Sequence, residues 1–191
     1  MSGTYPATPE FQAINLTSTH NNLRSVTVSG RVQVRTIGGQ KWAFSAKYNP
    51  MTREEFQPVF AFTASQQGAL GTFTIVPPVI GSTSGTASGT ALVNGATSAG
   101  EKQILVDGFT GTMKAGDFVK FGHTKVYMLT ADIDGAGTLN IEPALVANVN
   151  NDEVVVYNNV AFTMRLKNDV QQFGLNQFNY YTYEIDMEEV I

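Results

Sequence analysis

The chain has 191 residues, of which 42% are hydrophobic and 15% are charged, and its net charge is −4 at pH 7. This composition is typical of a folded protein with a buried core, and it excludes a disordered chain or one that coats nucleic acid. Because the chain has no cysteine, disulfides, thiol catalysis and cysteine-based zinc sites are excluded as well.

Two segments with an alternating pattern follow a polar lead-in at residues 1–22. In the first, which begins at Ser25, the apolar positions are Val26, Val28, Val32 and Val34. In the second, which follows a Gly38-Gly39 turn, they are Trp42, Phe44, Ala46 and Tyr48. The pattern predicts two half-buried antiparallel strands with basic side chains on the solvent face, and Gly30 interrupts the first as a turn or bulge.

The stretch NPMTREEFQPVFAFTASQQG carries a helix signal. Thr52 and Glu55 have the spacing of a capping box, and Met51 and Phe56 have the spacing of a hydrophobic staple. Pro58 falls too late to occupy a free first-turn position, so we expect a kink or a broken first turn there. The next stretch, GTFTIVPP, is typical of a strand that ends at prolines.

The character of the chain changes from Val79. Residues 81–100 are rich in Gly, Ser, Thr and Ala, which is typical of a linker. Beyond them, short alternating segments predict five strands that suggest a small closed β-barrel of the OB type or similar. These candidates are Gln103–Asp107, Asp117–Phe121, Lys125–Thr130, Thr138–Ile141 and Glu153–Tyr157.

The first pattern returns after Asn159, with apolar residues at alternate positions from Val160 to Leu166 and an aromatic, acidic final strand. Charge also separates the segments, because residues 79–158 carry four lysines and eight acidic residues whereas the remainder is neutral. We therefore predict a mainly β protein. We expect residues 1–78 and 159–191 to form one domain, interrupted by an inserted small barrel at 79–158.

Asp117 and His123 are the first candidate for catalysis. On a straight strand a separation of six residues puts them on one face but roughly 20 Å apart, at about 3.3 Å per residue. No serine or cysteine nucleophile accompanies them in a recognisable motif. We therefore interpret Asp117 as a turn residue at the start of a strand and His123 as a residue at a loop tip.

The segment DIDGAGTLNIE resembles a calcium loop, with Asp132, Asp134 and Glu142 around glycines. Its glycine and glutamate do not occupy the EF-hand positions, and both flanks have strand patterns rather than helix patterns. Turn chemistry is the favoured interpretation, and a loose calcium site at Asp132 and Asp134 stays open as an alternative.

Other acidic and aromatic clusters have structural interpretations. Glu54 and Glu55 suit the start of a helix. The acidic residues Glu184, Asp186 and Glu188 alternate with apolar ones, as expected for the solvent face of a strand. The aromatic run from Phe178 to Tyr183 could stack on sugar rings, but core and interface packing is the favoured role. We expect no catalytic residue, cofactor or metal.

Three parts of the chain are informative when they are taken together. They are the segment RVQVRTIGGQKWAFSAKYNPMTREEFQPVFAFTASQQGALGTFTIVPP, the insert AGDFVKFGHTKVYMLTADIDGAGTLNIEPAL, and the closing FTMRLKNDVQQFG and YEIDMEEVI. Together they resemble tail proteins of long-tailed bacteriophages. The resemblance is greatest to distal tail proteins, the ring subunits between tail tube and tip, and covers nearly the whole chain from about residue 24. It implies an antiparallel β-barrel or sandwich core with a flanking helix, closed as a ring of six copies, and an outward inserted barrel that is OB-like in some members.

The resemblance also implies a location and partners. The protein would assemble in the host cytoplasm and lie in the virion, at the tail tip or baseplate. There it would contact the tail tube protein and the tip hub or tape-measure proteins. The candidate ring-interface charges are Arg31, Arg35, Glu184 and Asp186.

An alternative is a host-surface module that binds carbohydrate through the inserted barrel. Net charge gives no reason to expect nucleic acid as a partner. The first residues do not have the pattern of a signal peptide, and no apolar run approaches the about 18 residues of a membrane span, so we expect no membrane insertion.

Overall fold

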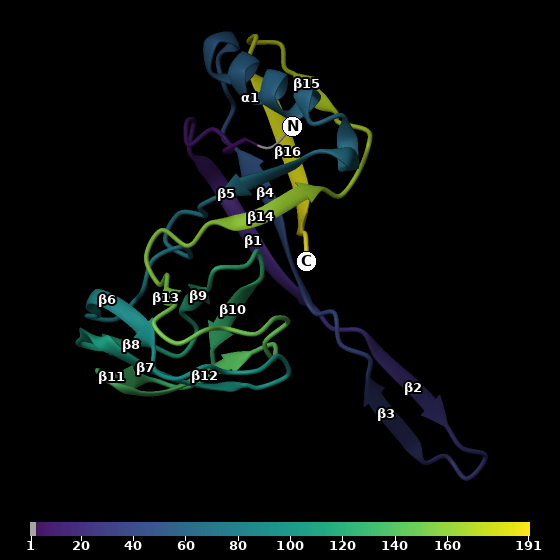
Figure 1. The fold of residues 1–191 in the computed structure, drawn as a ribbon. Helices are drawn as coiled ribbons and strands as arrows, with labels where there is room; N and C mark the ends of the chain where they lie inside the picture. Colours follow the sequence, from purple (N-terminus) through teal and green to yellow (C-terminus); the bar gives the residue numbers. More distant parts are fainter. Residues whose placement is uncertain (1–2) are drawn as a thin grey trace. The chain divides into compact units, whose positions relative to one another are not determined.

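The computed structural model describes residues 3–191, which form two compact units (Figure 1). The first unit contains the residues up to Phe73 together with Met164–Ile191, and the second is Thr74–Thr163. The stretch 79–158, interpreted above as an insert, lies within the second unit. The predicted fold class is confirmed, because the described chain is mainly β, with antiparallel sheets, one α-helix and a nearly closed barrel-like sheet.

The first unit is built on a six-stranded sheet in the order β1-β4-β16-β14-β5, with β15 paired to β16. Its strands are β1 (Phe11–Thr19), β4 (Lys41–Tyr48), β5 (Thr72–Ile75), β14 (Phe162–Leu166), β15 (Phe173–Leu175) and β16 (Tyr181–Glu189). In β4, Trp42, Phe44, Ala46 and Tyr48 are all buried, as their alternation predicts. Strands β5 and β14 are neighbours, and the boundary between the two units falls within each of them.

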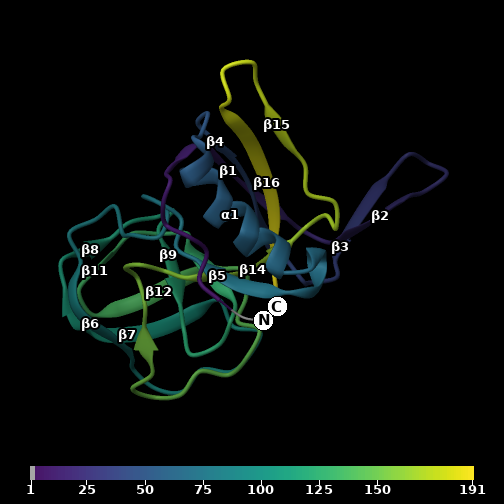
Figure 2. The ribbon, with the colours of Figure 1, turned by 90° about the horizontal axis from the view of Figure 1, so that it is seen from above.

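Helix α1 (Arg53–Ser65) crosses over this sheet (Figure 2) and buries Phe56, Val59 and Thr63. Glu55 Oε2 accepts hydrogen bonds from the backbone N–H of Thr52 at 2.8 Å and from its hydroxyl at 2.9 Å, so these two residues interact at the helix start as predicted. A short 3₁₀ helix, η1 (Gly68–Leu70), follows. Within the described residues, no helix has both the length and the apolar character needed to cross a bilayer.

Pro58 does not interrupt this helix, so the predicted broken first turn is wrong. The hydrogen bond that a proline at this position cannot donate would reach the carbonyl oxygen of Glu54. Glu54 is exposed in the first turn, where water can satisfy that carbonyl.

Strands β2 (Asn22–Val26) and β3 (Val32–Thr36) follow β1 and precede β4 in the sequence, and they form a separate two-stranded ribbon, which we call the arm (Figure 1). Every residue of both strands is exposed, so the prediction of half-buried strands is wrong here although the alternation is correct. Gly30 lies in the turn, as predicted, with φ of 81° and its N–H bonded to the carbonyl oxygen of Thr27.

The second unit is a barrel-like sheet in the order β13-β6-β7-β12-β10-β9. Its strands are β6 (Ser88–Val93), β7 (Gln103–Thr110), β9 (Phe118–Lys120), β10 (Val126–Leu129), β12 (Gly137–Glu142) and β13 (Val154–Val155). Lys120 and Val156 exchange backbone hydrogen bonds of 2.9 and 2.8 Å, which connect β9 to the segment after β13. A two-stranded pair, β8 (Thr112–Met113) and β11 (Ile133–Asp134), accompanies the sheet.

The Gly/Ser/Thr-rich stretch at 81–100 is not a linker, which corrects the sequence interpretation. It contains β6, a strand hydrogen-bonded on both sides, whose Ala91 and Val93 are fully buried in the barrel core. Glycine at position 85 has a packing reason, because an added Cβ would overlap the carbonyl oxygen of Thr112. That oxygen also accepts hydrogen bonds from the N–H groups of Thr86 and Ala87. Small residues therefore permit close backbone approach here.

Candidate functional site

Asp117 is a structural anchor in the second unit. One carboxylate oxygen accepts hydrogen bonds from the backbone N–H of Ser84 at 2.8 Å and from its hydroxyl at 2.7 Å. The other accepts from the N–H of Lys114 at 2.9 Å and from the hydroxyl of Thr83. Asp117 thus ties the segment before β6 to the turn before β9, which agrees with its interpretation as a turn residue.

The hydrogen bonds of Asp117 also set its protonation. Burial by itself raises the pKa of this carboxyl group, but the donors on Thr83, Lys114 and Ser84 outweigh burial and hold the pKa below the ordinary value of 3.8. The group is therefore ionised at neutral pH. Because these donors occupy both of its oxygens, it is poorly placed to act as a general base.

We expect Asp117→Asn to destabilise the protein by about 2 kcal/mol at pH 7, because the amide loses the charge and turns an NH₂ group toward existing donors. The contribution of the carboxylate is fully present above the pKa of the unfolded chain, near 3.9, and disappears as the pH falls through the lower folded pKa. Urea unfolding at pH 7 and at pH 3 measures this difference. Glu101→Gln, a charge removal at an exposed site, is the control and should change stability by less than about 0.5 kcal/mol.

His123 has different partners from Asp117. Its Nε2 lies 2.7 Å from the hydroxyl oxygen of Tyr127, and this oxygen accepts a hydrogen bond of 3.0 Å from the N–H of Val146. Tyr127 can therefore donate its proton to a neutral His123 ring. Burial lowers the pKa of His123, and Lys120 lowers it further, although Glu153 opposes them. Asp117 and His123, the first candidate for a catalytic pair, thus have separate hydrogen-bond partners, in agreement with the structural interpretation that the sequence favoured.

We expect the His123 ring to titrate below pH 6.5, because its folded environment favours the neutral form. In a folded state with a depressed histidine pKa, stability is full above the unfolded pKa and falls as the pH drops below it. An NMR titration of His20→Gln, which leaves His123 as the remaining histidine, measures the pKa directly. Adding Tyr127→Phe should raise the pKa, and a midpoint at or above 6.5 in the parent would contradict this assignment.

The candidate calcium loop has internal partners for its carboxylates. Asp132 accepts hydrogen bonds from Lys114 Nζ and from the N–H of Ala115, each at 2.8 Å, and these bonds lower its pKa. Asp134 receives a long hydrogen bond of 3.4 Å from the hydroxyl of Thr112. Over residues 3–191 no group of three or more His, Asp or Glu side chains is arranged to hold a metal ion. The geometry agrees with the turn interpretation of this segment.

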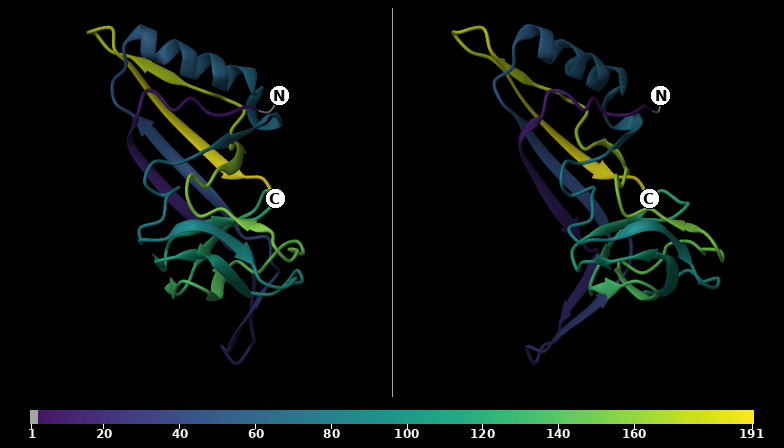
Figure 3. Two further views of the ribbon diagram at one scale, coloured as in Figure 1. Left: turned by 60° about the vertical axis from the view of Figure 1, so that its left-hand side comes forward. Right: turned by 90° about the vertical axis from the view of Figure 1, so that its left-hand side faces the viewer.

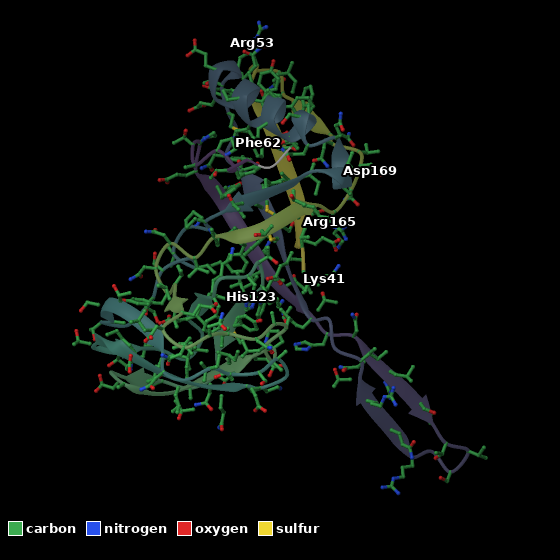
Figure 4. All side chains as sticks on the ribbon, viewed as in Figure 1. Lys41, Arg53, Phe62, His123, Arg165 and Asp169 are labelled. Atoms are coloured by element: carbon green, nitrogen blue, oxygen red, sulfur yellow. The ribbon has the colours of Figure 1, made fainter. Side chains whose placement is uncertain are left out.

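The four candidate ring-interface charges fall in two places. Arg31 lies in the turn of the arm and Arg35 lies on β3, whereas Glu184 and Asp186 lie on β16 next to β4. The structure does not bring the two sets together within the described chain, where none of the four side chains forms an ion pair. By contrast, Glu188 binds Arg165 at 2.6 Å and lies 3.9 Å from Lys41. Figure 4 labels Arg165 and Lys41. Glu184 and Asp186 are therefore available to form ion pairs with a partner.

The arm combines exposed apolar side chains with positive charge. Its exposed apolar residues are Leu23, Val26, Val28, Val32 and Val34. Its charged residues are Arg24, Arg31 and Arg35, and the sequence has no acidic residue between Glu10 and Glu54. An isolated two-stranded hairpin is only marginally stable in water. The arm therefore has the properties of a segment that becomes covered on binding.

A second exposed apolar region lies on the β15–β16 hairpin of the same unit. Figure 3 shows β15 running alongside α1, and Phe173 packs on Phe56 with ring centroids 4.9 Å apart. Beyond this contact, Leu175, Phe178 and Tyr180 are exposed, and the Phe178 side chain is 70% accessible. The aromatic run was predicted to serve in core and interface packing, and its buried member Tyr183 confirms the core part.

An open groove of about 590 Å³ lies beside this hairpin, and we call it the β15–β16 groove. It is lined by Lys47, Val170, Gln172, Phe173, Glu184 and Asp186 among others. Hydrogen bonds hold its loop in place, from Tyr183 hydroxyl to Gln171 at 2.9 Å and from the N–H of Ala69 to Asp169 at 2.9 Å. Glu184 and Asp186 thus lie in a concave surface with an apolar side.

No family model and no curated protein sequence matches the chain. The candidate sites are therefore assigned from their own chemistry, which is that of two separate exposed surfaces, the arm and the groove. Sequence reasoning missed the groove, because residues 168–174 have no periodic pattern. It also missed that no other part of the described chain packs on the arm. The positive charge on both faces of the arm is the signal that could have indicated this exposure.

Proposed function

We propose that this chain is a structural subunit of a bacteriophage tail tip or baseplate, where copies close into a ring that joins the tail tube to the tip hub. The observation that carries the proposal is the fully exposed arm, a two-stranded ribbon with apolar and basic side chains. Monomeric proteins rarely leave such a surface in water, whereas an assembly covers it. The assignment to a phage tail and the number of six copies rest on the resemblance described above.

The second unit fits an accessory domain of such a subunit better than a sugar-binding module. Carbohydrate-binding surfaces use exposed aromatic rings for stacking. Every aromatic side chain of this unit is buried, namely Phe109, Phe118, Phe121, Tyr127, Tyr157 and Phe162. The barrel therefore offers no exposed aromatic ring on which a sugar could stack. Host-surface glycan binding through this barrel is the weaker proposal.

The test is the solution mass of the purified full-length chain, measured by light scattering over a range of concentrations and supported by negative-stain images. We expect one closed species with a mass of several copies, and six is the number proposed. A chain that stays monomeric at all concentrations, and that also fails to join purified tail tube protein, would overturn the proposal. An open filament would overturn the closed ring.

A further inference from the structure

We propose that the arm of one copy docks in the β15–β16 groove of the next copy. The valine face of the arm would cover the apolar side of the groove, and Arg24 would meet Glu184 and Asp186. This inference rests on the proposed assembly and specifies the contact that builds it. The occupant of the groove is a second copy of this chain, because the chain itself carries both complementary surfaces and leaves both uncovered.

The arm has two different faces. Residues directly opposite each other in an antiparallel pair point to the same side. Arg24 lies opposite Val34, and Val26 lies opposite Val32, so these four side chains share one face. Arg35 lies opposite Leu23 on the other face. The valine face therefore offers a continuous apolar strip with a single positive charge beside it.

The arm is also held at its base. The N–H of Ile37 donates a 2.9 Å hydrogen bond to the carbonyl oxygen of Asn21, and the side chain of Asn21 donates one of 3.2 Å to the carbonyl oxygen of Gly39. The turn is fixed by the N–H of Arg31, which donates to the Thr27 hydroxyl at 3.1 Å. These hydrogen bonds favour the ribbon conformation before docking, which offsets part of the entropic cost of ordering a marginally stable hairpin.

The groove has the complementary composition. Val170 and Phe173 form an apolar side, and both are exposed. Glu184 and Asp186 supply negative charge and lack an ion-pair partner within the described chain, with Lys47 as the cation that also lines the groove. An interface between two different surfaces of one chain repeats head to tail, and it closes into a ring when the rotation permits.

Disulfide cross-linking tests the contact, because the natural chain has no cysteine. The full-length double variant Val34→Cys with Gln172→Cys places one thiol on the valine face and one at the groove, at two exposed positions. After mild oxidation, a non-reducing gel should show a ladder that extends beyond the dimer. Each single variant can form at most a dimer, since every chain then has one thiol. Val154→Cys with Gln172→Cys, with an exposed valine of the second unit in place of Val34, is the matched control and should give no ladder.

The outcomes separate this inference from the proposed function. A ladder together with a closed oligomer supports both, and a ladder from open filaments supports the contact but not the ring. A closed oligomer without a ladder overturns the arm–groove contact and leaves the ring standing. Absence of both oligomer and ladder overturns both, and an internal disulfide within a monomer overturns the docking between copies.

Charge reversal adds a second readout on the same double-cysteine variant. Arg24→Glu should lower the ladder yield about fivefold or more at low salt, because like charges would then meet in the contact. Glu184→Arg in the same chain should restore much of the yield. Arg35→Glu makes an equal change of charge on the opposite face of the arm and should have a much smaller effect. Equal losses with Arg24→Glu and Arg35→Glu would overturn the assignment of the valine face.

Discussion

Replacing Phe56 with alanine should destabilise the first unit by about 3–5 kcal/mol, the usual range for a buried phenylalanine. Phe56 is 4% accessible and stacks on Tyr181 with ring centroids 4.5 Å apart. It also contacts Phe173 at 4.9 Å and Phe60 at 5.3 Å. Phe56 therefore packs α1 against the β15–β16 hairpin together with Phe60, and its removal leaves a cavity between the helix and the hairpin.

The single tryptophan reports on this unit. Trp42 lies on β4 and is 3% accessible, so its fluorescence should change when the sheet unfolds in urea. Phe178→Ala makes the same substitution at an exposed position and should change the unfolding free energy by less than about 0.5 kcal/mol in dilute solution. If Phe56→Ala were equally mild, α1 would not be fastened through this aromatic cluster.

Gly85→Ala is expected to destabilise the second unit by at least about 3 kcal/mol, at the upper end of the range for overpacking. The new methyl group would overlap the Thr112 carbonyl oxygen, which is backbone and cannot turn away. That carbonyl also accepts the hydrogen bonds of Thr86 and Ala87, so a shift of either segment breaks them. Hydrogen exchange of the β6 and β7 amide groups measures the loss.

Gly95→Ala separates this overlap from simple backbone strain. Gly95 has a φ of 93° but open space around its Cα, so alanine there meets only the conformational penalty, about 1–2 kcal/mol. Faster exchange throughout β6 and β7 in Gly85→Ala than in Gly95→Ala is the expected order. The reverse order would mean that residues 81–100 pack loosely, as a linker does.

Local pattern predicted the central strands well. In β4 and β16 large apolar residues alternate with polar ones, and the alternation predicts burial correctly because one face of the sheet that contains both strands is buried. The same period in the arm led to a wrong prediction of burial. Alternation shows that the two faces of a strand differ in polarity. Whether another part of the protein packs on the apolar face depends on residues far away in the sequence.

Strand β6 and the partners of Asp117 illustrate two further limits. Alanine and threonine give a weak hydrophobic signal, although Ala91 is fully buried in the barrel. Thr83 and Ser84 lie more than thirty residues before Asp117, so no local spacing joins them. The charged residues proposed for assembly could be identified in the sequence. Which of them share a face of the arm with the valines became clear only from the register of β2 against β3.

The chain enters the second unit through β5 and leaves it through β14, and these two strands are neighbours in the sheet of the first unit. An inserted domain whose two ends lie side by side can be exchanged without stretching the host fold. A short turn that joins Ile75 to Phe162 should therefore preserve the sheet, and another small domain can occupy the same position. The second unit is in this sense exchangeable, so one scaffold can carry different inserted domains while its own core stays constant.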